Sequence, residues 1–364
     1  MGTVLSILIV IVILGVLITV HEFGHFIAAR KSGIRVHEFA IGMGPKIWKK
    51  KKGETLYAIR AIPIGGFCNM GEDSEADPED IHAFPNAKRR HRALVLAAGS
   101  LMNFILGFLI LLGLNLFYPE NSFAFTYPVV ADVEQQSDDP EWAPLLKAGD
   151  RILRLNGHAL YNYQDFLMFF ELMGDRPLSL VVQRDGQKLT FNNMQKTTFT
   201  HEGETVARYG FSRGYELREA TFWLRIENGW TNTLNYTRLV WVTLGELFGG
   251  RASVTDMMGP AGMANMVQTE VQNPDTTTAA KTVNIVNLTA LIAVNLAVMN
   301  LLPIPGLDGS RLLFVAIEGV RRKKLNPKYE GYVHLAGMVL LFGLMIFIFF
   351  NDIIRWITGG LTAG

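Results

Sequence analysis

The sequence has 364 residues, of which 49% are hydrophobic and 18% are charged, and its formal net charge is +1. So much apolar surface, gathered into a few runs, excludes an ordinary soluble domain and is typical of a membrane protein. The small net charge gives no support to nucleic acid as a partner. The single cysteine, Cys68, excludes an intramolecular disulfide and a metal site made only of cysteines.

Four apolar runs predict four transmembrane helices. The first, residues 4–20, lacks the basic leader and the cleavage site of a secretory signal peptide, so we interpret it as a retained helix. The others cover residues 93–117, 283–302 and 333–350. The third run contains several asparagines, which indicate a face turned toward the protein interior or a wet cavity: Asn284, Asn287, Asn295 and Asn300.

Basic residues predict the orientation of these spans. They gather between the first and second spans and again between the third and fourth, where Arg321 to Lys324 form one run. By the positive-inside rule, both of these segments are cytoplasmic. We therefore expect both termini and the long central segment to be extracytoplasmic.

Three further regions have readable patterns. The alternation in VHEFAIG and TLYAIRAIPIGGF predicts two strands separated by a basic KKKKGE turn, either as a sheet at the bilayer edge or as a small soluble cytoplasmic sheet. Residues 127–194 predict short strands with a helix at 163–173, hence a compact β-rich domain. Residues 229–248 mix tryptophan and leucine with polar residues, which favours a helix lying along the outer membrane interface.

The motif HEFGH lies at the end of the first apolar run. His21 and His25 are four residues apart, so on a helix both imidazoles can ligate one zinc ion, and Glu22 can take a proton from water. Such a short motif also occurs by chance. Ionisable residues at a membrane-spanning helix are functional candidates, although a helix end emerging at the interface and a proton-relay cluster are alternatives.

A catalytic zinc site usually has three protein ligands. The segment NLLPIPGLDG, residues 300–309, ends the third span, and its prolines cannot continue a regular helix. Asp308 is the acidic side chain at that depth. It is either a third metal ligand or the N-cap of the helix that covers residues 311–320.

HEFGH and NLLPIPGLDG, in this order, resemble the site-2 protease family of intramembrane zinc metalloproteases, in its bacterial RseP/RasP branch. EFAIGMGP and AIRAIPIGGF are similar to its membrane-associated sheet, AAGSLMNF to its second span, and LLKAGDRILRLNG to a PDZ domain. Ser100 stands where the family usually has proline, which puts the local helix geometry in question. Ala131 stands where glycine is common, and there is room for one PDZ domain.

The resemblance implies a polytopic α-helical membrane protein with about four transmembrane helices, a membrane-associated β-sheet and one extracytoplasmic PDZ-like β-rich domain. The expected segments are 1–30 (first transmembrane helix with HEFGH), 34–73 (sheet), 91–118 (second transmembrane helix), 121–200 (PDZ-like domain), 226–250 (interfacial amphipathic helix), 279–310 (third transmembrane helix with the LDG motif), 311–325 (cytoplasmic helix) and 331–356 (fourth transmembrane helix).

It also implies roles for single residues. Asp308 would join His21 and His25 as a zinc ligand, and Glu22 would be the general base. Asn300 would bind the substrate backbone or the developing oxyanion. The sheet edge at Gly65 and Gly66 would pair with an unwound substrate strand, because a helical substrate hides its peptide groups.

The expected activity is that of a metalloendopeptidase in the bacterial inner membrane, with its active site toward the cytoplasmic side. Implied substrates are single-span membrane proteins, such as anti-sigma factors or remnant signal peptides, met within the lipid bilayer and screened by the PDZ-like domain. One alternative is a catalytically inactive membrane scaffold that binds peptides through its PDZ domain. Another is a metal or proton transporter, which the large exterior domain and the lack of an internal repeat disfavour.

Overall fold

The computed structural model describes residues 2–71, 79–118, 125–133, 146–201, 204–250, 259–323, 325 and 327–357. Parts of the expected segments, among them 121–124 and 134–145 of the expected PDZ-like domain, lie outside the described residues. The chain forms two compact units. One comprises residues 1–111 and 236–364, and the other residues 112–235.

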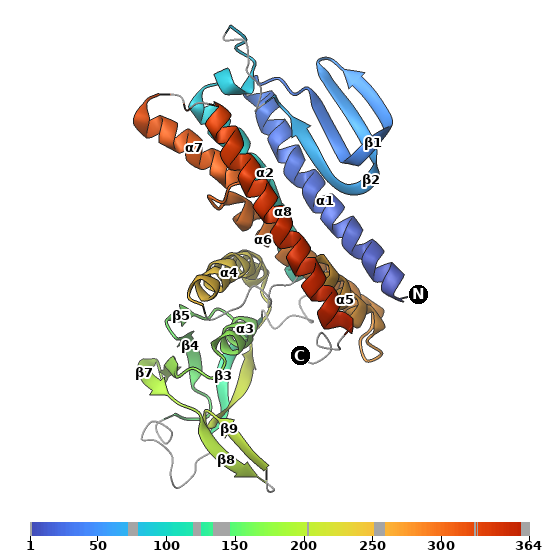
Figure 1. Cartoon of the computed structure of the whole chain (residues 1–364). Helices are drawn as coiled ribbons and strands as arrows, with labels where there is room; N and C mark the ends of the chain where they lie inside the picture. Colours follow the sequence, from blue (N-terminus) through green and yellow to red (C-terminus); the bar gives the residue numbers. More distant parts are fainter. Residues whose placement is uncertain are drawn as a thin grey trace. The chain divides into compact units, whose positions relative to one another are not determined.

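Four described helices are long and apolar enough to cross a membrane, as the apolar runs predict. They are α1 (Gly2–Lys31), α2 (Arg89–Phe117), α6 (Thr278–Leu301) and α8 (Pro327–Ile357) (Figure 1). Many large apolar side chains of α8 are exposed, for example Leu340 and Phe342. Exposed apolar side chains along a helix of this length are expected where lipid is the solvent.

The first unit is held together where the long helices approach closely. A Cβ on Gly24 of α1 would lie 2.4 Å from the Ala98 carbonyl oxygen of α2, and one on Gly107 would lie 2.6 Å from Val294 of α6. Small residues at such contacts allow helix backbones to pack tightly without side chains between them. The same unit contains α5 (Pro260–Gln272), α7 (Asp308–Arg321) and a short 3₁₀ helix, η1 (Phe84–Asn86).

A sheet made of β1 (Glu38–Lys52) and β2 (Thr55–Asn69) lies along α1 (Figure 1). Both strands are long and bent, so residues 38–41 have Cα partners at 56–59 and also at 66–69. The pairing of Lys52 with Thr55 places the turn at Gly53 and Glu54, where Gly53 has φ +63°. The lysines at 49–52 are therefore part of β1, and their prediction as a turn was wrong: glycine's left-handed backbone makes the reversal.

The second unit contains a six-stranded sheet with the order β10-β3-β4-β6-β7 and β5 paired to β4. Its strands are β3 (Thr126–Val133), β4 (Arg151–Leu155), β5 (His158–Ala159), β6 (Leu178–Arg184), β7 (Gln187–Met194) and β10 (Phe211–Leu217). A separate hairpin consists of β8 (Thr197–His201) and β9 (Glu204–Arg208). The apolar faces of β4 and β6 are buried, which fits their alternating sequences.

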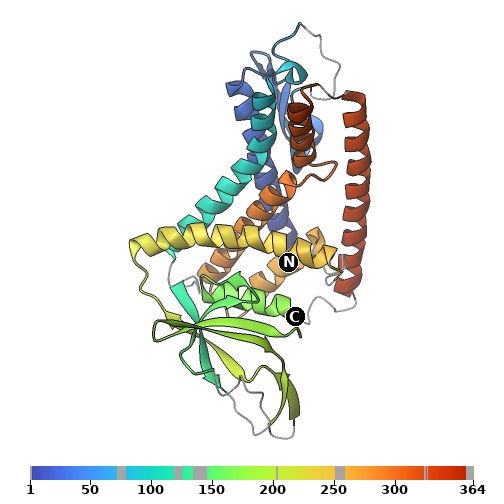
Figure 2. The ribbon, with the colours of Figure 1, turned by 90° about the vertical axis from the view of Figure 1, so that its left-hand side faces the viewer.

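Helix α3 (Tyr163–Met173), a green helix in Figure 2, lies beside this sheet. Its Phe166 and Phe169 side chains are fully buried. Its N-cap, Asn162, accepts a hydrogen bond from the Asp165 backbone N–H at 2.9 Å. Helix α4 (Phe222–Phe248) begins in this unit, where Asn232 accepts a hydrogen bond from the Asn162 side chain at 3.0 Å. The buried amide pair links the start of α3 to Asn232, about three turns into α4.

Candidate metal centre

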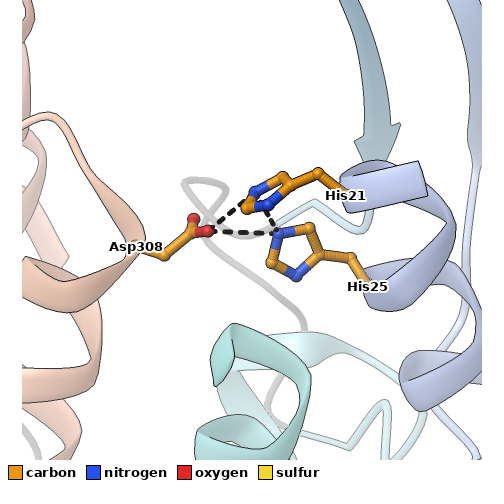
Figure 3. Close-up of side chains that lie close together, drawn as sticks. All are labelled: His21, His25 and Asp308. Atoms are coloured by element: carbon orange, nitrogen blue, oxygen red, sulfur yellow. Dashed lines mark hydrogen bonds and ion pairs between the residues drawn. The ribbon is translucent and has the colours of Figure 1, made fainter. Parts of the chain in front are cut away.

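Three side chains from two helices converge in the first unit (Figure 3). His21 and His25 lie one turn apart on α1, and Asp308 is the first residue of α7. The two Nε2 atoms are 3.1 Å apart. Asp308 Oδ2 lies 3.0 Å from Nε2 of His21 and 3.2 Å from Nε2 of His25. The three candidate ligand atoms thus form a nearly equilateral triangle.

The neutral tautomer of His25 makes this triangle a site for a cation. Nδ1 of His25 lies 2.8 Å from the Val95 carbonyl oxygen, which can only accept, so the ring donates there. The neutral ring then presents a lone pair on Nε2 to the Asp308 carboxylate. Acceptors that face one another in a buried place repel unless a cation lies between them.

The spacing of the triangle fits zinc. A tetrahedral ion with ligand bonds of about 2.0–2.1 Å places its ligand atoms about 3.3 Å apart. The observed separations of 3.0–3.2 Å are close to this value. His21 and His25 are buried, and Asp308 is about a quarter exposed. Two imidazoles and one carboxylate therefore suit a zinc ion with a position left for water.

Helix α2 shapes the centre without supplying a ligand. The Val95 carbonyl orients His25, and a Cβ on Gly99 would lie 2.4 Å from Nε2 of His25 and 2.8 Å from Nε2 of His21. Any side chain at Gly99 would displace the imidazoles. Neither Val95 nor Gly99 was predicted from the sequence to act at this site, because a backbone carbonyl and a missing side chain leave little trace in a sequence.

The loop before α7 presents Asp308 to the histidines. Helix α6 ends at Leu301, and Pro303, Pro305 and Gly306, with φ +101°, follow it. A Cβ on Gly309 would lie 2.2 Å from the Leu302 carbonyl oxygen, so glycine is needed for this close return. The N-cap of α7 is Leu307, without a side-chain cap. Asp308 is therefore the first residue of α7 and not its N-cap, so the alternative prediction of an N-cap role was wrong.

The other residues predicted for the site differ in how closely they approach the triad. Glu22 is half-buried on α1. A Cβ on Gly66 would lie 3.5 Å from Cγ of Glu22, so the sheet segment at Gly66 approaches the candidate base. Gly65 has φ +88° and packs against Met43 instead. Asn300 is the residue before the end of α6, and none of the described contacts of the triad involves it.

Together, the four candidate spans and the His-His-Asp triad define a polytopic membrane protein with a candidate zinc centre. Residues 9–344 match the family model for peptidase family M50. The zinc metalloprotease RasP of Bacillus licheniformis is 30% identical, with 95% of this chain and 98% of the relative covered. The regulator of sigma-W protease RasP of Bacillus subtilis is 28% identical, with 95% and 97% covered.

A zinc metalloprotease RasP of Geobacillus kaustophilus is also 28% identical, with 96% of this chain and 97% of the relative covered. The chain belongs to peptidase family M50. This membership confirms the predicted resemblance to the site-2 proteases and the prediction of a metalloprotease.

Proposed function

We propose that this chain is an intramembrane zinc metalloprotease that hydrolyses peptide bonds within or near the transmembrane segments of single-span proteins. The observation that carries the proposal is the convergence of His21, His25 and Asp308 beside Glu22 on helices of a multi-span chain. The relatives named zinc metalloprotease support zinc as the metal. A peptide-binding scaffold without catalysis would not need this set of residues.

His21, His25 and Asp308 would hold the ion. Bound zinc lowers the pKa of water and polarises a carbonyl group. Glu22, next in sequence to a ligand, would accept a proton from the attacking water and deliver it to the leaving amine. Asn300, near the end of α6, is proposed to donate its amide N–H to the substrate carbonyl oxygen, where negative charge develops.

The substrate strand is proposed to add to β2 near Gly65 and Gly66. In the described pairing, residues 66–69 have strand partners at 38–41, on one side. An extended peptide could hydrogen-bond along the other side, which would place it near Glu22. This step has a physical motive, because the carbonyls of a helical substrate are occupied by their own hydrogen bonds.

The proposed substrates are anti-sigma factors already trimmed outside, or remnant signal peptides. One relative carries the name regulator of sigma-W protease, which supports the first class. The second unit is proposed to be a PDZ-like domain outside the cytoplasm that screens bulky ectodomains, with both termini on the same side. The protein would reside in the bacterial inner membrane, with its active site toward the cytoplasm.

Reconstitution with a single-span substrate tests the proposal. The native chain should cleave it and contain about one zinc ion per chain. Glu22→Gln should retain the zinc, because the three ligands remain, and should lose at least about 100-fold in rate, the scale of a general base. Equal cleavage by both proteins, or a native chain without zinc, would exclude the proposed mechanism.

A further inference from the structure

A buried ion pair joins α2 to α7 at a distance from the candidate metal centre. Arg92 Nη1 lies 2.8 Å from Glu318 Oε2, and the two side chains are 7% and 5% exposed. The other carboxylate oxygen of Glu318 accepts a hydrogen bond from the Leu325 backbone N–H at 3.0 Å. Arg89 donates to the carbonyl oxygens of Glu318 and Gly319, at 2.9 and 3.3 Å. The C-terminal part of α7 is therefore bound firmly to the beginning of α2.

Stability alone is a weak reason for such a pair. Removing two charges from water is costly, and a buried pair often contributes no more stability than apolar residues of the same volume. What an ion pair does supply is a fixed geometry, because a guanidinium and a carboxylate meet in few orientations. The pair is therefore suited to setting the position of α7.

The position of α7 matters because its first residue is Asp308. Between Asp308 and Glu318, Val315 packs into a core with Ala28 of α1 and Val95 of α2. At 1.5 Å per residue, Val315 lies about 4.5 Å along the axis from Glu318 and about 10.5 Å from Asp308. If α7 pivots at Val315, a shift at Glu318 moves Asp308 about twice as far in the opposite direction. Zinc ligands tolerate errors of about 0.2 Å.

The face of α2 that carries Arg92 also positions the histidines. Val95 accepts the hydrogen bond of His25, and Gly99 adjoins both histidine rings. Arg92, Val95 and Gly99 are spaced i, i+3 and i+7, so they lie along one face of the helix. Helix α2 thus contacts both helices that carry the ligands, although it contributes none itself.

We propose that Arg92 and Glu318 are positioning residues that set Asp308 against His21 and His25 by fixing α7 to α2. This inference rests on the proposed zinc site. The ion pair would then determine the geometry of the metal centre, because α2 contacts both α1 and α7, the helices that carry the ligands.

The double variant Arg92→Met/Glu318→Met separates positioning from stability. Two apolar residues of similar length replace the pair, so no charge is left buried alone. In the full-length protein in detergent, we expect the thermal midpoint of the metal-free form to stay within about 5 °C of native. The dissociation constant for zinc, from chelator competition, should rise about 10- to 100-fold, as for outer partners of metal ligands.

Cobalt bound in place of zinc reports the coordination geometry of the metal centre without a catalytic assay. Its visible absorption depends on coordination geometry. The spectrum of the cobalt-loaded double variant should therefore differ from that of the native protein. Arg184→Met is the matched control, because Arg184 pairs with buried Asp150 in the other unit. It should lower stability while the zinc constant and the cobalt spectrum stay native.

A zinc constant within twofold of native in a folded double variant, with an unchanged cobalt spectrum, would overturn the inference. If the double variant fails to fold, Arg92→Lys decides in the same assays. It keeps the charge but loses the rigid fork of the guanidinium, so it should weaken zinc binding by about three- to tenfold, and native affinity would overturn the inference. Absence of metal binding in the native protein would instead refute the proposed zinc site.

Discussion

Gly99 occupies a place that both candidate histidine ligands need. A Cβ there would come within 2.4 Å of His25 Nε2, closer than real Cβ contacts. We expect Gly99→Ala to displace the imidazoles, to weaken zinc binding by at least about 100-fold and to abolish cleavage, because zinc ligands tolerate only small errors. Zinc content and chelator competition measure the effect.

The control for this substitution lies on the same helix. Nothing lies within 4 Å of a Cβ on Gly113, so Gly113→Ala adds a methyl group in open space. It should leave the zinc constant within twofold of native and favour the helix by about 1 kcal/mol. If Gly99→Ala binds zinc as tightly as Gly113→Ala, the close approach of position 99 to the histidine rings does not affect zinc binding.

The ligands of the candidate site were readable from the sequence because their chemistry is explicit. His21 and His25 form a spaced pair, and Asp308 is acidic at the end of an apolar run. Val95 acts through its backbone carbonyl, which every residue possesses, and Gly99 acts by lacking a side chain. Their roles depend on which helix faces α1, and local periodicity does not encode that.

Within the β1–β2 sheet, Glu38 pairs with one cation from each strand. It accepts from Lys46 and from Arg60, each at 2.8 Å. Burial by itself raises the pKa of Glu38, but these two cations outweigh it and place the pKa below its ordinary value. The contribution of the carboxylate to stability is therefore present above the unfolded pKa of about 4.3 and is lost as the pH falls through the lower, folded pKa.

Comparison with Glu38→Gln measures that contribution. At pH 7 the variant should be less stable by about 0.5–1 kcal/mol, the size of a solvent-screened ion pair. The difference should persist down to about pH 4.3 and disappear as the pH falls further, through the lower folded pKa of Glu38, because the native carboxylate is then protonated. Thermal unfolding of both proteins across this range is the measurement. A constant difference at all pH values would mean that the charge of Glu38 is not the cause.

The start of α5 is capped by a residue from a distant helix. Asp352 of α8 is buried and accepts hydrogen bonds from the backbone N–H groups of Gly259 and Gly262, at 3.0 and 2.8 Å. Asp352→Ala should lower the free energy of unfolding by about 1–3 kcal/mol, because it leaves two buried donors unpaired. Asp352→Asn keeps an acceptor and should lose less. Denaturation of the full chain in detergent measures both.

An exposed cap provides the comparison for Asp352. Thr277 caps α6 by accepting an exposed hydrogen bond from the Ala280 backbone N–H at 3.2 Å. Water can replace this bond, so Thr277→Ala should cost only about 0.5–1 kcal/mol. Equal losses for Asp352→Ala and Thr277→Ala would show that the burial of the Asp352 contacts adds nothing.

Elements with a strong local pattern agree with the structure, and those that depend on distant pairing do not follow from sequence. The helix expected at 163–173 is α3, with the same bounds. Strand β10, Phe211–Leu217, lies beyond the segment 121–200 that was expected to form the β-rich domain. Its pairing with β3 joins residues about 80 positions apart, for example Phe211 with Val133. Polar residues along β10 also conceal its alternation.

At the scale of the whole molecule, the spans were predictable because length and hydropathy suffice to recognise a helix that can cross a bilayer. The division into two units was not. The boundaries at residues 111–112 and 235–236 fall inside α2 and α4, where no linker or change of composition marks them. Long helices that belong to both units leave no boundary signal in the sequence.

The orientation in the membrane remains a prediction from the basic residues, and it decides where substrates are screened. The single native cysteine makes a labelling test simple. Burial, and then the nearby Glu22 carboxylate, raise the pKa of the Cys68 thiol to about 12. Because the thiolate is the reactive form, Cys68 should react slowly with a maleimide near neutral pH. The native chain is then its own unlabelled control.

Lys49→Cys in β1 and Lys188→Cys in β7 each introduce one exposed thiol. With a membrane-impermeant maleimide on intact cells, Lys188→Cys should be labelled and Lys49→Cys should not, because the positive-inside rule places the lysine run of β1 in the cytoplasm. Permeabilised cells should show both labelled. The reverse pattern would place the second unit in the cytoplasm, where it could not screen ectodomains, so the proposed order of external trimming before intramembrane cleavage would lose its structural basis.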